Sequence, residues 1–187
     1  MQEEIKKTLD ILHAGGIILY PTDTIWGIGC DATNEKAVQR IYEIKKRADS
    51  KSMLILIDDA YRIPSYIDEM PELAWDLIEL SEKPLTIIYP AAKNLAKNLI
   101  AEDGSIGIRV SRDEFTKELI RRFKKPIVST SANISGQATP AFFDEISDEI
   151  KSAVDYIVNY RQNDTTQSSP SGIIKLEVNG EVKVIRE

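Results

Sequence analysis

The chain has 187 residues, of which 42% are hydrophobic and 29% charged, as is typical of one soluble globular domain with a substantial core. The formal net charge of −6 excludes a global basic field that would draw the chain onto nucleic acid or an anionic membrane, so any anion site has to be local. No apolar run is long enough to cross a bilayer and no apolar signal core follows Met1, so we expect a cytoplasmic protein.

The first half of the chain alternates predicted helices and strands. The apolar run at 17–20, between two glycines and Pro21, predicts a strand buried on both faces. Two hydroxyls and a carboxylate follow at 22–24, and the glycines of 27–29 then predict a loop that turns or approaches a ligand closely. The other predicted elements in this half are helices at 2–14, 34–47 and 71–80 and strands at 53–57 and 85–89.

Capping and turn signals organise the second half. Ser111 and Glu114 have the spacing of a capping box and predict the start of a helix that reaches residue 123. Asn179-Gly180 predicts a hairpin between antiparallel strands. The remaining predictions are strands at 106–110, 127–130, 156–158, 172–176 and 181–185 and a helix at 142–154. Helices and strands thus alternate, which predicts a single α/β domain over 1–187 with a mixed sheet.

Hydroxyl and amide side chains lie at the ends of several predicted strands. In an open α/β sheet, the loops at the carboxyl ends of the strands form the ligand crevice. We therefore expect one cavity to be faced by Thr22, Thr24, Thr86, Ser129, Thr130, Ser131 and Asn133. These groups can orient a small polar ligand, but they provide no activated nucleophile.

Positive charge gathers at Lys45, Arg47 and Lys51, and a guanidinium can bind phosphate or carboxylate bidentately. The alternative is a solvated basic helix end that complements the helix dipole, and spacing alone favours this alternative slightly. Arg109 lies inside a predicted buried strand, where a guanidinium needs a partner. It either forms a structural ion pair or contacts a ligand, and the pattern slightly favours the ion pair.

The only cysteine, Cys30, excludes an intramolecular disulfide, and the only histidine, His13, ends a predicted surface helix. A Cys–His catalytic pair is therefore not expected, and a small buried thiol is the favoured interpretation. The sequence has no Walker A pattern, no Rossmann glycine fingerprint, no His or Cys metal-ligand cluster and no Ser–His–Asp set. The residues thus predict a hydroxyl-rich, locally basic cleft for an anion, but they do not identify a reaction.

Five segments form a combined pattern that is more specific than any one of them. They are Tyr20-Pro21-Thr22-Asp23-Thr24 with Gly27, Gly29, Cys30 and Asp31; Lys45-x-Arg47 with Lys51; Lys83-Pro84-Leu85-Thr86; Gly107-x-Arg109-Val110; and Pro126-x-Val128-Ser129-Thr130-Ser131-Ala132-Asn133-x-Ser135-Gly136. In this order, and over nearly the whole chain, the pattern resembles the YrdC/TsaC family, in its short single-domain bacterial type.

The resemblance implies a twisted, mixed, open sheet flanked by helices, with a large concave cavity lined by positive charge. It implies an L-threonylcarbamoyladenylate synthase, a nucleotidyltransferase that forms threonylcarbamoyl-AMP and pyrophosphate from L-threonine, bicarbonate or CO2, and ATP. The product would serve the N6-threonylcarbamoyladenosine modification of tRNA position 37 through downstream transfer machinery, with contact to tRNA or other double-stranded RNA as a further implication. Mg2+ would enter with ATP, and no protein-bound metal cluster is expected.

The resemblance also carries site roles onto matching positions of this sequence. The family's catalytic KxR and SxN pairs match Lys45 with Arg47 and Ser131 with Asn133. Its threonine-binding positions match Thr24, Thr86, Ser131 and Ser171, and its ATP-binding positions match Arg47, Lys51, Asn133 and Arg186.

Three departures from the family pattern affect the predicted contacts. Ala48 and Ser52 replace prolines around the KxR pair, Leu56 replaces a histidine that longer members carry near threonine, and Gly172 replaces a frequent threonine. An RNA-binding module without ATP turnover and a diverged, YciO-like paralogue are the competing functions. The acidic total charge speaks against the first, and retention of both the KxR and the SxN pairs speaks against the second.

Overall fold

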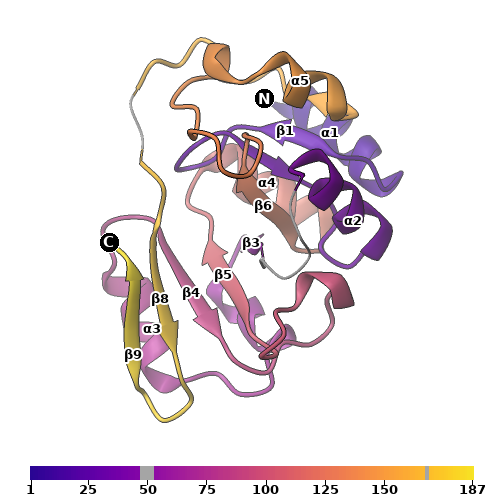
Figure 1. The fold of residues 1–187 in the computed structure, drawn as a ribbon. Helices are drawn as coiled ribbons and strands as arrows, with labels where there is room; N and C mark the ends of the chain where they lie inside the picture. Colours follow the sequence, from indigo (N-terminus) through magenta and orange to yellow (C-terminus); the bar gives the residue numbers. More distant parts are fainter. Residues whose placement is uncertain (47–52, 167–168) are drawn as a thin grey trace.

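The computed structural model describes residues 1–46, 53–166 and 169–187, in which nine strands form one sheet (Figure 1). The strands are β1 (Ile18–Tyr20), β2 (Gly27–Gly29), β3 (Leu54–Ile57), β4 (Leu85–Tyr89), β5 (Ile106–Val110), β6 (Ile127–Ser131), β7 (Tyr156–Ile157), β8 (Gly172–Leu176) and β9 (Val182–Arg186). Their order across the sheet is β7-β1-β2-β6-β3-β5-β4-β8-β9. The sheet contains parallel pairs such as β3/β5 and antiparallel pairs such as β3/β6, so the predicted mixed α/β sheet is confirmed.

Helices pack on both faces of this sheet. The helices within the described ranges are α1 (Gln2–His13), α2 (Glu35–Ile44), α3 (Glu72–Leu80), α4 (Glu114–Phe123) and α5 (Asp148–Ala153), with 3-10 turns η1 (Ala60–Ser65), η2 (Lys97–Leu99) and η3 (Phe143–Glu145). None of these helices combines the length and the apolar character that crossing a membrane requires.

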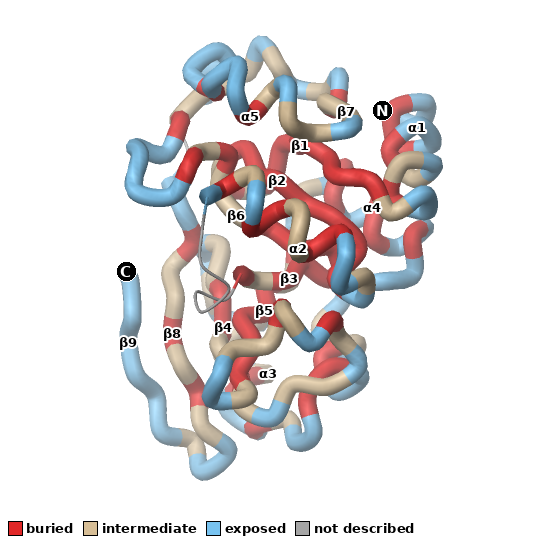
Figure 2. The backbone as a smooth tube through the Cα atoms, turned by 45° about the vertical axis from the view of Figure 1, so that its right-hand side comes forward, coloured by how far each residue is buried: buried red, intermediate tan, exposed pale blue. Residues whose placement is uncertain are grey.

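Alternate residues of the central strands belong to two apolar clusters, and the buried backbone forms a continuous layer through the molecule (Figure 2). Leu19, Ile28 and Ile55 pack with residues of α2 on one face, whereas Ile18 and Leu56 pack with α1 and α4 on the other. Successive strand residues point to opposite faces, so both faces of the central strands are buried. The predicted strand at 17–20 is therefore confirmed as buried on both sides.

The segment Gly27–Gly29 is a strand and not the predicted loop, because β2 pairs antiparallel with both β1 and β6. Its glycines allow neighbouring chain segments to approach closely. A Cβ atom at Gly29 would lie 2.6 Å from the carbonyl oxygen of Val128 and 2.7 Å from Cε1 of Tyr20. Glycine here serves close packing within the sheet, which a single sequence cannot distinguish from a flexible loop.

The single helix predicted at 142–154 is also wrong, because η3 and α5 are separate elements. Ile146 between them has extended backbone and a buried side chain. Ser147 then starts α5 by accepting a hydrogen bond from the backbone N–H of Ile150 (3.4 Å). Burial of Ile146 together with a new N-cap therefore interrupts the helical pattern.

Two predicted helix ends shift by a few residues. The N-cap of α4 is Asp113, whose carboxylate accepts the Thr116 N–H at 2.8 Å, and not Ser111. The helix predicted at 34–47 begins at the predicted cap Asn34 but ends at Ile44, which makes Lys45 its C-cap. Lys45 therefore sits where the chain leaves the helix and not on a continuing helical surface.

Two local predictions are confirmed. Strands β8 and β9 form the antiparallel hairpin predicted at Asn179-Gly180, and Gly180 takes a φ of +86°, which glycine adopts without strain. Cys30 is fully buried, and burial raises the pKa of its thiol. The interpretation of Cys30 as a buried thiol is therefore confirmed. His13 packs against the ring of Phe123, with ring centroids 5.0 Å apart.

Candidate active site

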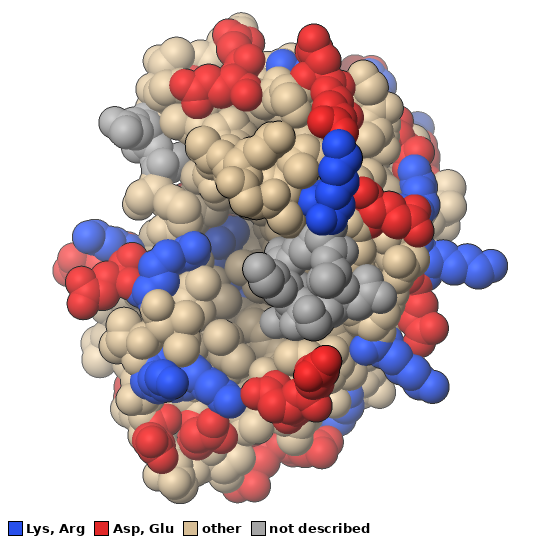
Figure 3. Space-filling view, in the orientation of Figure 1, with Lys and Arg blue, Asp and Glu red and all other residues tan. Residues whose placement is uncertain are grey.

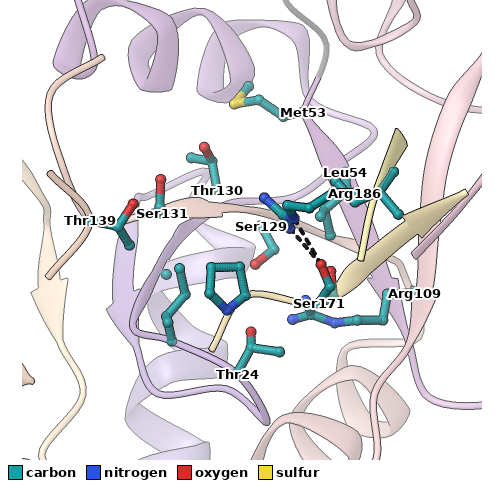
Figure 4. A pocket seen from close by; sticks show the side chains of 14 residues that line it. Thr24, Met53, Leu54, Arg109, Ser129, Thr130, Ser131, Thr139, Ser171 and Arg186 are labelled. Carbon is teal, nitrogen blue, oxygen red and sulfur yellow. Dashed lines mark hydrogen bonds between the residues drawn. The ribbon is translucent and has the colours of Figure 1, made fainter. Parts of the chain in front are cut away.

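A pocket of about 240 Å³ lies between the β1–β2 turn, the strands at the centre of the sheet and the C-terminal hairpin (Figure 4). Figure 3 shows this face of the molecule hollowed near its middle, with Lys and Arg side chains at one side of the hollow. The pocket is lined by Thr24, Ile25, Gly27, Met53, Leu54, Arg109, Ser129, Thr130, Ser131, Thr139, Pro170, Ser171, Ile173 and Arg186. Its described lining offers hydroxyls and two guanidinium groups but no carboxylate. The larger concave cavity implied by the resemblance stays a prediction.

The direction of the strands explains why these residues meet. Leu54 at the amino end of β3 is the cross-strand partner of Ser129 at the middle of β6, because these two strands are antiparallel. Leu54 also pairs with Gly107 of β5, so all three positions lie on the same face of the sheet. The sequence predicted a crevice at the carboxyl ends of the strands, and the carboxyl end of β6 does line the pocket. The prediction was incomplete, because in a mixed sheet the amino end of an antiparallel neighbour, here β3, lies at the same place.

The turn after β1 presents one hydroxyl to the pocket and uses the other for its own structure. Thr22 Oγ1 donates to the carbonyl oxygen of Ile25 (2.8 Å) and accepts the Thr24 N–H (3.1 Å). It also lies 3.0 Å from Thr24 Oγ1. Because the Thr22 hydrogen is used by Ile25, Thr24 donates to Thr22, and the lone pairs of the Thr24 hydroxyl are available to a ligand.

Arg109 forms a buried ion pair at the floor of the pocket. Its Nη2 lies 3.1 Å from Asp23 Oδ1, and its side chain is only 4% exposed. Within the described ranges, Arg109 Nε and Asp23 Oδ1 have no hydrogen-bond partner of good geometry. The favoured structural ion pair is confirmed. Arg109 also lines the pocket, and its contact with a ligand, the alternative that the sequence left open, stays a prediction.

A second guanidinium comes from the last strand. Arg186 donates from Nε (3.0 Å) and Nη2 (2.7 Å) to the carbonyl oxygen of Ser171, as Figure 4 shows. Partial burial, together with the positive charge of Arg109, lowers the pKa of Arg186. The positive charges of the two guanidinium groups repel each other, which makes this part of the pocket favourable for an anion.

Ser171 and Thr86 form a hydroxyl pair beside these arginines. Their Oγ and Oγ1 atoms are 2.8 Å apart, and both side chains are buried. Ser171 lines the pocket, whereas Thr86 lies behind it and is not a lining residue. Thr86 therefore supports Ser171 in this structure.

Of the described residues of the KxR and SxN pairs, Ser131 lines the pocket, and Lys45 and Asn133 do not. Lys45 is buried at 2% exposure, and its Nζ donates to the carbonyl oxygens of Ser131 and Asn133 at 2.7 Å each. The solvated helix end favoured by spacing alone is therefore wrong for Lys45. The Asn133 side chain donates to the Gln137 carbonyl oxygen (2.7 Å) and does not line the pocket, whereas Ser131 does. Arg47 and Lys51 lie outside the described residues.

Sequence reasoning missed several residues that line the pocket. Met53 and Thr139 carried no signal that distinguishes them from ordinary loop or strand residues, whereas Pro170 and Ile173 belong to the segment around Ser171 that resembles the family. Leu56, the position where longer family members carry a histidine, is fully buried in the cluster beneath α1 and α4, and Leu54 lines the pocket instead. Because side chains alternate along a strand, both leucines lie on the same face of the sheet. The sequence therefore could not show that Leu56 is covered by helices whereas Leu54 faces the pocket.

The fold and the pocket together define a class: an α/β protein with a mixed sheet and a hydroxyl-lined, positively charged pocket suited to a small anionic ligand. A family model for the Sua5/YciO/YrdC proteins, described as telomere recombination, matches residues 10–187. The chain therefore belongs to the Sua5/YciO/YrdC family.

Relatives and solved structures agree with this membership. A protein of Pseudoalteromonas translucida named threonylcarbamoyl-AMP synthase is 35% identical over 185 residues, with 97% of each chain covered. A relative from Methanocaldococcus jannaschii is 37% identical over 181 residues, covering 94% of this chain and 84% of its own. Among solved structures, E. coli YciO superposes with a TM-score of 0.86 at 25% identity, covering all of this chain and 90% of YciO. P. abyssi Sua5 complexed with L-threonine superposes at 0.84 and 24% identity, over 94% of this chain and 52% of that one, and so shows the shared fold.

Proposed function

We propose that this chain is a threonylcarbamoyl-AMP synthase, which converts L-threonine, bicarbonate or CO2, and ATP into threonylcarbamoyl-AMP and pyrophosphate for modification of tRNA position 37. One observation carries the proposal: Thr24, Ser131, Ser171 and Arg186 come from four distant segments and line one pocket. The family resemblance had given each of these residues a substrate contact. The same activity is supported by the relative named threonylcarbamoyl-AMP synthase, because the alignment with it covers 97% of both chains.

The chemistry suits a pocket without a nucleophilic side chain. The amine nitrogen of threonine first bonds to the carbon of CO2 and loses a proton to give a carbamate. Where bicarbonate supplies the carbon, a water molecule leaves in this step. A carbamate oxygen then bonds to the α-phosphorus of ATP while the bond to the leaving pyrophosphate breaks. Both steps need positioned reactants and stabilised negative charge more than a protein nucleophile.

The residues of the pocket divide between threonine and ATP. The amino acid is oriented by the hydroxyl groups of Thr24 and Ser171, and Thr86 supports Ser171. Arg109 supplies positive charge for the carboxylate of the amino acid. Ser131 extends this hydroxyl lining towards the reacting groups. Arg186 binds ATP together with Arg47, Lys51 and Asn133, the partners that the resemblance gives.

Mg2+ fits this pocket as a companion of ATP. The described residues hold no group of three or more His, Cys, Asp or Glu side chains arranged to bind a metal ion, and the described lining offers neutral hydroxyl oxygens. Phosphate oxygens would therefore supply the charged ligands, with Ser131 and Thr130 as hard-oxygen neighbours. The ion would neutralise the charge that develops on the phosphates.

The first test is pyrophosphate release by the purified protein with ATP, Mg2+ and bicarbonate, with L-threonine, L-serine or no amino acid. Release that requires both bicarbonate and threonine is the expected result. ATP binding without threonine-dependent release would contradict the synthase and favour a diverged paralogue. Salt-sensitive binding of double-stranded RNA, the downstream transfer machinery and a cytoplasmic location stay predictions that this assay does not address.

A further inference from the structure

The end of α2 is joined to the segment 131–135 by both the side chain and the backbone of Lys45. Its Nζ donates to the carbonyl oxygens of Ser131 and Asn133, each at 2.7 Å. Its own carbonyl oxygen accepts the N–H of Ser135 at 3.0 Å. One residue thus makes three hydrogen bonds to a segment that contains the whole SxN pair.

The opposite side of this segment is held by the sheet. Ser131 is the cross-strand partner of Gly27 in β2, and the N–H of Ala132 donates to the carbonyl oxygen of Trp26 at 3.2 Å. The segment is therefore fixed between β2 and the end of α2. Removing the Lys45 side chain would leave only the backbone bond from Ser135 on the α2 side, so the segment would loosen there while its strand pairing with β2 remains.

The environment of the Lys45 ammonium supports a positioning role. The residue is 2% exposed, follows the last residue of α2 and does not line the pocket. The carbonyl groups at a helix C-terminus carry partial negative charge, which stabilises a cation there. Hydrogen bonds from a charged donor are stronger than neutral ones, so two such bonds hold the carbonyl groups of Ser131 and Asn133 firmly.

We propose that Lys45 is a positioning residue, which acts on the reaction through the backbone of Ser131 and Asn133 and not by touching the phosphates. This inference rests on the proposed function, because its consequence is the placement of the Ser131 hydroxyl towards the substrates. It differs from the charge-bearing role that the resemblance gave to this lysine.

The test combines amide hydrogen exchange of the substrate-free protein with steady-state kinetics for Lys45→Met and Lys45→Gln. Lys46→Met is the matched control, because Lys46 is the next residue, is exposed and pairs with Glu149 at 2.7 Å. For Lys45→Met we expect faster exchange across 132–137 and KM values for threonine and ATP raised by about tenfold or more, since charged hydrogen bonds are lost. We expect kcat at saturation to change by less than about threefold.

Lys45→Gln separates the two roles, because it keeps an N–H donor but carries no charge. A positioning role predicts that this variant recovers part of the KM lost in Lys45→Met, whereas a direct charge contact predicts two equally impaired enzymes. A large fall in kcat with unchanged amide exchange would overturn the proposal, as would exchange equal to that of Lys46→Met. Should the wild type release no pyrophosphate, the proposed function fails, while the exchange comparison still tests the contact between Lys45 and the 131–135 segment. If Lys45→Met does not fold, the comparison is made with Lys45→Gln.

Discussion

The two sides of the pocket are built differently. One side, the buried wall, consists of Thr24 on the β1–β2 turn, Gly27 on β2, and Ser129 and Ser131 on β6, two strands inside the sheet. The other side, the edge wall, consists of Ser171, which directly precedes β8, together with Ile173 on β8 and Arg186 on β9. Strand β9 is the edge of the sheet, and each of its residues is exposed. The buried wall is held by strands on both sides and the edge wall by a terminal hairpin. We therefore expect changes in the first to affect folding and changes in the second to affect binding.

The largest effect is expected for Gly29→Ala, beside the buried wall. The new Cβ would meet the Val128 carbonyl at 2.6 Å, and backbone inside a sheet cannot move away easily. We expect the free energy of unfolding to fall by more than about 3 kcal/mol, measured by urea denaturation.

Gly172→Ala, beside the edge wall, is the matched control for Gly29→Ala. Its nearest atoms, the Arg186 carbonyl oxygen and Leu85 Cδ1, are both 3.7 Å away, which is ordinary contact. We expect a change within about 0.5 kcal/mol. Equal losses in both variants would refute the difference between the two walls.

Asp23→Asn removes the ion pair that ties the β1–β2 turn of the buried wall to β5. The guanidinium of Arg109 would remain buried without its carboxylate, and breaking a buried pair from one side costs about 3 kcal/mol. We expect a corresponding loss of stability in denaturant unfolding. The double variant Asp23→Asn, Arg109→Met should regain part of this loss, and strictly additive losses would contradict the coupling.

Arg186→Ala tests the edge wall directly. Because the side chain belongs to an exposed strand, we expect the free energy of unfolding to change by less than about 1 kcal/mol. ATP affinity, measured by calorimetry, should fall by about tenfold or more, because a charged hydrogen-bond donor is lost. Arg122→Ala, an exposed arginine of α4 paired with Glu118, is the control and should bind ATP normally. Unaltered affinity in Arg186→Ala would remove this residue from the ATP site.

The smallest effect concerns a contact that ties β8 to the chain before β5. Hydrogen bonds from Ser105 and the ammonium of Lys175 lower the pKa of Asp103 to about 2. A carboxyl group with a lowered folded-state pKa stabilises the protein above its unfolded pKa, near 4, and this contribution is lost as the pH falls towards 2. The side chain is 54% exposed, so solvent screening keeps the contribution below about 1 kcal/mol.

The variant Asp103→Asn tests this contact through the acid limb of the stability curve. We expect the variant to lose less stability than the wild type between pH 4 and pH 2, measured by denaturant titration at fixed pH values. Parallel curves for the two proteins would show that Asp103 contributes nothing to holding β8.

The sequence by itself determined the class of fold and most of the elements, because periodicity, caps and turn residues are local signals. The buried strand at 17–20, the Asn34 cap and the Asn179-Gly180 hairpin all follow from residues close in sequence. The sequence pattern also identified the family. Four positions to which the resemblance gave substrate contacts, Thr24, Ser131, Ser171 and Arg186, line one pocket.

Only the tertiary structure decided how distant residues meet. Gly27–Gly29 is a strand because β1 and β6 lie beside it, and Lys45 is buried because the 131–135 segment covers it. The ion pair between Asp23 and Arg109 joins positions that no local pattern relates. The residues next to a position in the sequence indicate which of its faces is buried. Strand register and long-range partners depend on the whole chain. It is this register and these partners that determine the chemistry of the pocket.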